Sequence, residues 1–158
     1  MDSGTPIHIL IRYSDRLHRV GGVITRHNEV IQSQGSVWFG KLGRQVAQKH
    51  IDAVNQQCVS GIPTYLYLVQ KAGSGYVVDQ GTVTEMARVL PPGKEHLVPE
   101  YYFTTGIIDG IRLWARLCEI KSIEPSYLGK LRALSSIMPV PETLARSMSS
   151  HFIVREIA

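Results

Sequence analysis

Apolar and polar residues alternate along several short stretches of the chain, and this period of two is typical of β-strands. The alternation predicts strands at residues 7–13, 36–41, 64–70, 76–78, 81–90, 107–123 and 151–157. The glycine-rich residues 71–75 predict a hairpin turn after the third of these strands. The last strand is expected to pair with the first.

Other segments lack this alternation. Apolar residues recur at helical spacings of four, three and four between residues 47 and 58, which predicts a helix over residues 43–60. Pro141 suits the first turn of a second helix. Residues 14–34 show no clear period and are predicted to form a long loop, a kind of segment that often carries function.

The composition is that of a folded domain. Of the 158 residues, 44% are apolar and 19% are charged, which excludes disorder as the main state. The length suits one domain rather than two. Several strands with two or three helices between them predict a single α+β domain over residues 1–158, with a strongly curved sheet or a small β-barrel.

The cellular compartment and the need for cofactors are inferred from membrane-span, signal-peptide and cysteine patterns in the sequence. No stretch approaches the roughly 20 apolar residues of a membrane span, and the N-terminal residues 1–4 do not resemble a secretory signal. Cys58 and Cys118 are too few for a disulfide framework and are expected to be buried free thiols. We therefore expect a cytoplasmic domain without membrane contact or cofactor. Because the chain ends directly after a predicted strand, we also expect it to be part of a longer polypeptide.

The net charge of +4 is concentrated in the first third of the chain. Residues 1–50 hold seven Lys and Arg against three Asp and Glu, whereas the remaining residues hold ten of each. A basic segment suits a polyanionic partner, although a solvated basic surface is equally open on charge alone. The candidate phosphate-binding residues are Arg12, Arg16, Arg19, Arg26, Lys41, Arg44, Arg112 and Arg116.

The segment from Gly35 to Lys41 has the glycine and lysine spacing of a nucleotide-binding P-loop. However, Leu42 follows where that loop requires a Ser or Thr to bind magnesium, so nucleotide hydrolysis is not expected. The turn from Gly40 to Arg44 suits a smaller role, because its amides and cations could hold one phosphate. A plain glycine turn with solvated cations is the alternative.

Asp109, Glu119 and Lys121 show the loose pattern of a metal-dependent nuclease. The pattern is short and common, and the neighbouring Leu113 and Leu117 place it near a core. We expect these residues to be structural and assign no catalytic residue and no metal ligand. Since no other catalytic motif is present, we expect the domain not to be an enzyme.

Aromatic residues give the more specific signal. Arg112, Trp114 and Arg116 share one face of a predicted strand. If this face were in the core, its two guanidinium groups would need buried hydrogen-bond partners. This face suits arginines that bind phosphates beside an indole that stacks on a base. The alternative is a buried tryptophan whose neighbouring arginines only extend to solvent.

Trp38 and Phe39 are adjacent in a short strand, so one is expected to face the core and the other to be exposed or to line a pocket. Tyr65 and Tyr67 share a face of another strand. A pocket made of such rings could hold a flipped base by stacking, whereas core packing is the alternative for each ring. The candidate base-binding residues are Trp38, Phe39, Trp114, Tyr65 and Tyr67.

Four segments resemble the strand series of the PUA-like superfamily, in particular its EVE and YTH branches. They are residues 65–71 (YLYLVQK), 76–79 (YVVD), 81–86 (GTVTEM) and 114–120 (WARLCEI), and the likeness extends over residues 36–124. The resemblance implies a small curved barrel that binds RNA or DNA and holds a modified base in an aromatic cage. Similar domains precede the motor of McrBC-type modification-dependent restriction systems and recognise methylated DNA there.

These observations predict a non-catalytic nucleic-acid-binding domain that recognises a modified or flipped base. Its partner would be DNA or RNA, and it would serve as the recognition module of a larger restriction enzyme or as a separate adaptor. The alternatives are an RNA-binding PUA-like protein, a small nuclease that uses Asp109, Glu119 and Lys121, and a protein-interaction module.

Overall fold

The computed structural model describes residues 5–15 and 22–157, which form a seven-stranded mixed sheet. The strand order is β2-β5-β4-β3-β1-β7-β6. Central β1 pairs in parallel with β3 and antiparallel with β7, as expected for the last strand. The strands are β1 (His8–Arg12), β2 (Val37–Leu42), β3 (Tyr65–Ala72), β4 (Gly75–Ala87), β5 (Ile111–Ile123), β6 (Leu131–Ala133) and β7 (His151–Glu156).

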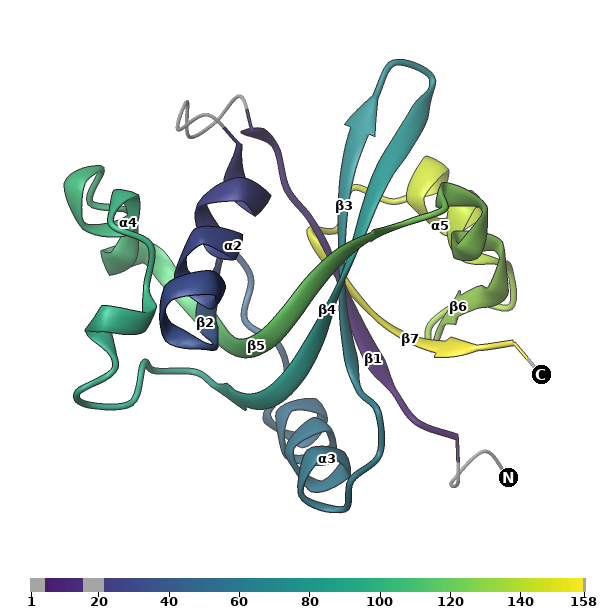
Figure 1. The fold of residues 1–158 in the computed structure, drawn as a ribbon. Coiled ribbons are helices and arrows are strands. Elements are labelled where there is room, and N and C mark those ends of the chain that lie inside the picture. The colour runs from purple at the N-terminus through teal and green to yellow at the C-terminus, as the bar shows by residue number, and fades with distance from the viewer. Residues whose placement is uncertain (1–4, 16–21, 158) are drawn as a thin grey trace.

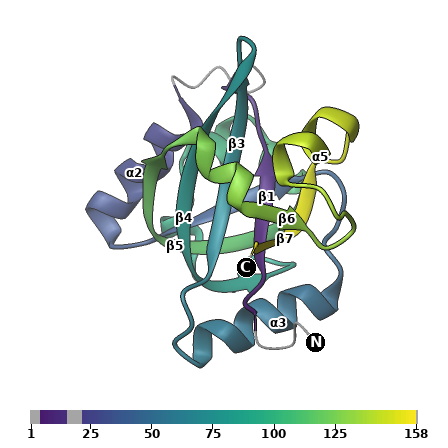
Figure 2. The ribbon, with the colours of Figure 1, turned by 90° about the vertical axis from the view of Figure 1, so that its right-hand side faces the viewer.

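Helices cover the sheet from different sides. They are α2 (Val23–Gln34), α3 (Gln48–Val59), α4 (Tyr101–Thr104) and α5 (Val140–Arg146), with 3₁₀ turns at Glu95–Leu97, Ile107–Gly110 and Pro125–Lys130. Helix α2 lies beside β2 and β5, whereas α5 lies beside β6 at the far side of the molecule (Figure 1). A view from the side shows α3 running across one end of the sheet (Figure 2). Within the described ranges, no helix has the length and apolarity to cross a membrane.

The long strands β4 and β5 bend strongly as they cross the molecule (Figure 1). The pairing of the two strands shifts at one point. Thr82 of β4 pairs with Glu119 of β5, but the next residue, Val83, pairs with Leu117, so Cys118 is an extra residue on β5. Such a bulge bends a strand and reverses which side chains face the core. Ile120 therefore joins the core of Leu117, although strict alternation along β5 would place it on the face of Trp114.

The sheet does not close into the predicted barrel. Strands β2 and β6 stand at the two ends of the hydrogen-bonded order, so the sheet is curved but open. The mixed α and β content agrees with the prediction, as do the β3–β4 hairpin and Pro141 in the first turn of α5.

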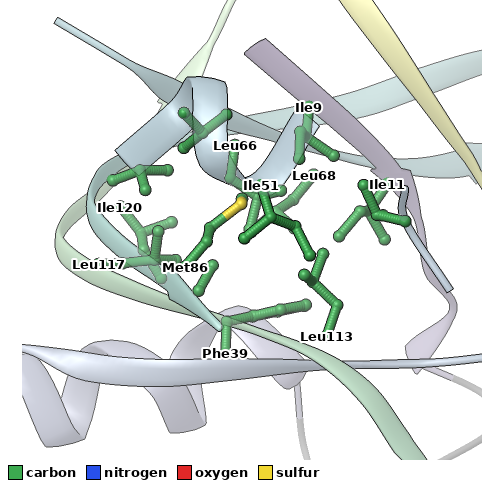
Figure 3. Close-up of a cluster of buried hydrophobic side chains, with 14 of the residues drawn as sticks. Ile9, Ile11, Phe39, Ile51, Leu66, Leu68, Met86, Leu113, Leu117 and Ile120 are labelled. Atoms are coloured by element: carbon green, nitrogen blue, oxygen red, sulfur yellow. The ribbon is translucent and has the colours of Figure 1, made fainter. Parts of the chain in front are cut away.

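Three clusters of buried side chains hold the layers together. The main core joins Ile9 of β1, Phe39 of β2, Ile51 of α3 and neighbouring aliphatic residues (Figure 3). A second cluster lies on the other face of the sheet, under α5 and β6. The third, called here the tryptophan cluster, consists of Trp38, Leu97, Val98, Tyr101, Tyr102, Ile111 and Trp114.

Helix α2 was not expected, since residues 14–34 were predicted to be a loop. Its inward face carries Val23, His27, Val30 and Ile31, which follow a helical period. Because His27 occupies a core position of that period and is fully buried, the apolar pattern in the sequence is interrupted. Helix α3 begins at Gln48, five residues later than predicted, and Cys118 is exposed rather than buried.

Candidate functional site

A small cavity of about 100 Å³ lies where the ends of β1 and β2 meet the segment around α4. Four aromatic residues line it, namely Tyr13, Phe39, Tyr101 and Tyr102. They come from β2, from the end of β1 and from α4, so the cavity exists only when these distant segments are assembled. Among the cations, Arg12 and Lys41 also line it.

One wall of the cavity is fixed by a buried chain of hydrogen bonds. The backbone N–H of Gly40 donates to the Tyr102 hydroxyl oxygen at 2.9 Å, and that oxygen lies 2.7 Å from Nε2 of His27. His27 Nδ1 lies 2.7 Å from the carbonyl oxygen of Val23, which can only accept. In the neutral imidazole, Nδ1–H therefore donates to Val23, and Nε2 accepts a hydrogen bond from the Tyr102 hydroxyl.

This chain of hydrogen bonds also protects an exposed sheet edge. Strand β2 is an edge strand, and Tyr102 satisfies its Gly40 N–H without a neighbouring strand. The approach requires glycine, because a Cβ at Gly40 would lie 2.8 Å from the Tyr102 ring and 2.9 Å from Ile111. Complete burial raises the pKa of Tyr102 well above its ordinary value, so its hydroxyl stays protonated.

Tyr13 and Tyr101 give the cavity two further rings. Tyr13 is half-buried just beyond β1, where its N–H donates to the carbonyl of Val69 at 3.0 Å. Burial, with smaller contributions from Asp79 and Asp15, raises the Tyr13 pKa well above its ordinary value. Burial likewise raises the pKa of Tyr101 to about 12. Both rings are therefore neutral near pH 7 and suit an uncharged planar group.

The segment that joins β1 to α2 is anchored at both ends. The Asp15 carboxylate accepts the Val23 N–H at 2.8 Å and the Gln70 side-chain amide at 3.1 Å. Asp15 thus caps the first turn of α2 in place of Gly22, which has no side chain to do so. Ser14 and Val23 both line the cavity. Arg16 and Arg19, predicted to bind phosphate, lie outside the described residues.

Lys41 and Arg12 lie at the cavity, but their cationic groups bind backbone carbonyls. Lys41 is 3% exposed, and its Nζ donates to the carbonyls of Leu42 and Arg44 at 3.0 and 2.6 Å. Burial, followed by the charge of Arg44, lowers the Lys41 pKa. Arg12 donates to the carbonyls of Leu144 and Ser147 at 2.6 and 2.7 Å. Both side chains hold loops together, which does not support direct phosphate binding.

The structure buries both Trp38 and Phe39, and it places Phe39 rather than Trp38 at the cavity. Trp38 is fully buried in the tryptophan cluster, whereas Phe39 is 4% exposed, packs in the main core and borders the cavity. Both are buried because β2 is covered on both faces. Trp114 is also buried, and the Tyr102 ring stacks on it at 5.7 Å. Neither tryptophan offers an exposed ring face to a base.

Tyr65 and Tyr67 lie on the opposite side of the sheet from the cavity. Tyr67 is fully buried and stacks on Tyr127, and half-buried Tyr65 packs beside it and against His8. These rings belong to the second cluster. They are left out of the candidate site because they do not approach the other rings.

The remaining candidate cations are dispersed. Arg26 pairs with Glu29 at 3.1 Å, and half-buried Arg116 donates to the Ser36 hydroxyl at 3.0 Å. Arg112 and Arg44 are exposed on different parts of the surface. With Trp114 buried beside Arg112 and Arg116, the arrangement matches the alternative in which the arginines only extend past a core tryptophan.

The residues of the nuclease pattern do not come together. Asp109 precedes β5, whereas Glu119 lies eight residues along that strand, so about 25 Å of extended chain separates them. Glu119 and Lys121 are exposed. In residues 5–15 and 22–157, no group of three or more His, Cys, Asp and Glu side chains is placed to hold a metal ion.

Sequence reasoning missed most of the cavity. It assigned no role to Tyr101, Tyr102 or His27, and it did not include Tyr13 among the candidate base-binding residues. The available signal was the run of Tyr101, Tyr102 and Phe103 directly after a proline-rich loop. Of the predicted base-binding rings, only Phe39 borders the cavity.

The architecture is an α+β domain with a strongly curved sheet and an aromatic cavity at its edge. Comparison with protein families matches residues 9–150 to the Pua-like family, and the chain belongs to that family. Domains of this family are commonly nucleic-acid-binding modules. No curated protein and no solved structure matches the chain.

Proposed function

We propose that this chain is a nucleic-acid-binding domain without catalytic activity of its own, and that its cavity holds one unpaired base. The preferred base is a methylated pyrimidine in DNA. Under this proposal the chain works in the cytoplasm as the recognition module of a modification-dependent restriction enzyme. Family membership supports binding of nucleic acid in general, and the cavity supports the choice of a single base.

The size and lining of the cavity carry the proposal. The cavity, at about 100 Å³, is well below the roughly 300–1,000 Å³ of pockets that enclose drug-sized ligands, so it suits a single planar ring. A pyrimidine with one methyl group is of this size, whereas a complete nucleotide is much larger. The neutral rings of Tyr13, Phe39 and Tyr101 suit stacking and edge contacts with a planar heterocycle.

The direct test is a binding titration with labelled oligonucleotides of one sequence. They carry either cytosine or 5-methylcytosine at one position, as DNA and as RNA. We expect the intact chain to prefer the methylated DNA. A ring that stacks on a base contributes about 1–3 kcal/mol, so Tyr13→Leu should weaken this binding roughly tenfold to a hundredfold.

The matched control is Tyr76→Leu, because Tyr76 is also half-buried but packs in the second cluster. It should retain the wild-type affinity and preference. Equal affinity for both cytosines would overturn the modified-base proposal, and a preference for RNA would favour the RNA-binding alternative. Undetectable binding to every oligonucleotide would leave the protein-interaction module as the stronger candidate.

The absence of catalysis is tested separately. DNA incubated with the protein and magnesium or manganese should remain intact, since Asp109 precedes β5 and Glu119 lies eight residues beyond the first residue of that extended strand. Cleavage that is abolished by Lys121→Ala would instead make the nuclease function the leading one.

A further inference from the structure

A second hollow, a groove of about 420 Å³, adjoins the cavity along two segments of the chain. Lys41 and Ser150 line the cavity, whereas Arg44 and His151, a few residues further on, line the groove. The two segments are close, since a Cβ at Gly43 would lie 3.9 Å from the Ser150 hydroxyl. A ligand in the cavity therefore has a neighbouring depression within reach.

The groove is lined by cationic and neutral polar groups. Arg44 is exposed, and His50 and His151 are half-buried. The neutral polar residues of the lining are Gln45, Ser135, Ser147 and Ser149, and apolar residues such as Phe152 lie between them. No Asp or Glu is among the described residues that line it. An electropositive depression without a carboxylate is complementary to an anion.

The surroundings of the groove strongly lower the pKa of His151. Burial lowers its pKa to about 4, and three positively charged or titratable groups add to the effect: Lys41 from β2, Arg44 from the following loop and His50 from α3. Its Nδ1 is buried and has no hydrogen-bond partner among the described residues. The imidazole is therefore neutral near pH 7, although an anion beside it would favour its protonated form.

The backbone around the groove holds Arg44 in place. The Lys41 ammonium fixes the carbonyls of Leu42 and Arg44, and Gly43 provides the left-handed turn between them with φ of 86°. Ala47, the N-cap of α3, and His50 in the first turn of that helix also line the groove. The positive end of the α3 dipole adds to the attraction for an anion.

We propose that this groove binds a phosphodiester group of the nucleic acid, with Arg44 as its cationic partner and the imidazoles of His50 and His151 as further polar partners. This inference rests on the proposed function for the identity of the ligand. Binding takes up a proton at His151, so affinity for the anion rises as the pH falls below 7. Lys41 acts as a positioning residue, because its bonds to the backbone hold the loop that presents Arg44.

The first experiment uses inorganic phosphate and the full chain. The pKa of His151 is measured by NMR in chloride and in phosphate at equal ionic strength. Phosphate should raise it from about 4 toward the ordinary value of about 6.5. Arg44→Gln should abolish most of that rise, whereas Lys71→Gln should keep it, since Lys71 is an exposed cation of the β3–β4 hairpin.

The second experiment measures oligonucleotide affinity at pH 5.5 and 7.5. If binding restores an ordinary histidine pKa of about 6.5, the intact chain should bind about tenfold more tightly at pH 5.5. His151→Gln should remove this difference and bind at both pH values as the intact chain does at pH 7.5. A thermal melt of each variant at pH 5.5 confirms that it is folded.

The outcomes separate this inference from the proposed function. If the His151 pKa is the same in chloride and in phosphate, the proposed phosphate site in the groove is overturned, even if oligonucleotide binding still depends on Tyr13. A rise with inorganic phosphate but no binding of any oligonucleotide would also overturn the phosphodiester assignment, leaving a site for free phosphate. An unchanged pH dependence in His151→Gln would show that another group takes up the proton.

Discussion

Trp38 and Phe39 are consecutive residues of β2, yet they lie in regions with different properties. Trp38 packs in the tryptophan cluster, where the residues around α4 cover it completely. Phe39, on the other face of the strand, borders a cavity that also has polar groups in its walls. One region is filled and the other is partly empty, although both contain several aromatic rings.

The comparison shows that a gathering of aromatic residues does not by itself identify a binding site. Each region contains four aromatic residues, and Tyr101 and Tyr102 belong to both, but the two tryptophans of the cluster are enclosed by other side chains. The cavity retains empty space beside hydrogen-bonded groups such as Tyr102. We therefore expect substitutions in the cluster to change stability and substitutions at the cavity to change binding.

The largest effect is expected for Trp38→Ala. Removing a fully buried indole leaves a void and should lower the free energy of unfolding by about 3–5 kcal/mol. Chemical denaturation measures this loss. Phe103→Ala is the control because Phe103 is 43% exposed, and it should cost much less. A Trp38→Ala variant with normal stability but impaired binding would reverse our assignment of the two regions.

Tyr102→Phe should have an intermediate effect, because Tyr102 belongs to both regions. Its ring stacks on Trp114, whereas its hydroxyl bonds to Gly40 and His27. The variant keeps the stacking but leaves two buried polar groups without a partner, so it should cost about 1–3 kcal/mol. Denaturant unfolding of Tyr102→Phe, His27→Leu and the double variant tests whether the two residues are coupled. Additive losses would contradict the hydrogen-bond chain.

Acid should destabilise the fold through histidines outside the tryptophan cluster. The folded pKa of His151 is lowered to about 4 and that of His8 is also lowered, in both cases mainly by burial. The unfolded chain, with ordinary histidine pKa values near 6.5, then binds more protons. Stability should therefore fall as the pH decreases from about 6.5 toward 4, as denaturation midpoints across this range would show.

His151→Gln should remove part of that pH dependence, whereas His96→Gln should leave it unchanged, because His96 is exposed. Identical pH profiles for the intact chain and His151→Gln would show that His151 titrates as it does in the unfolded chain.

The smallest effect concerns single surface cations. Each phosphate contact that is removed should reduce the slope of log affinity against log salt by about one. Arg44→Gln should produce this change, since Arg44 lines the groove. Arg112→Gln should not, since Arg112 lies on β5 beside the buried Trp114. The opposite result would place the nucleic-acid backbone over the tryptophan cluster instead of the groove.

The sequence by itself determined most of the strands and the mixed α and β class. Period-two alternation identifies strands such as β1 and β3, and glycine-rich turns identify hairpins, because both depend on neighbouring residues. The family was also recognisable from the order and spacing of the strands. These features are local or follow directly from sequence order.

Only the tertiary structure decided which faces are covered and where space remains. His27 and Tyr102 are 75 residues apart, and their hydrogen bond depends on Gly40 allowing a close approach at the sheet edge. The burial of both Trp38 and Phe39 likewise depends on segments that arrive from elsewhere in the chain to cover each face of β2. A cavity is a space between such segments, and the period of a single strand carries no information about it.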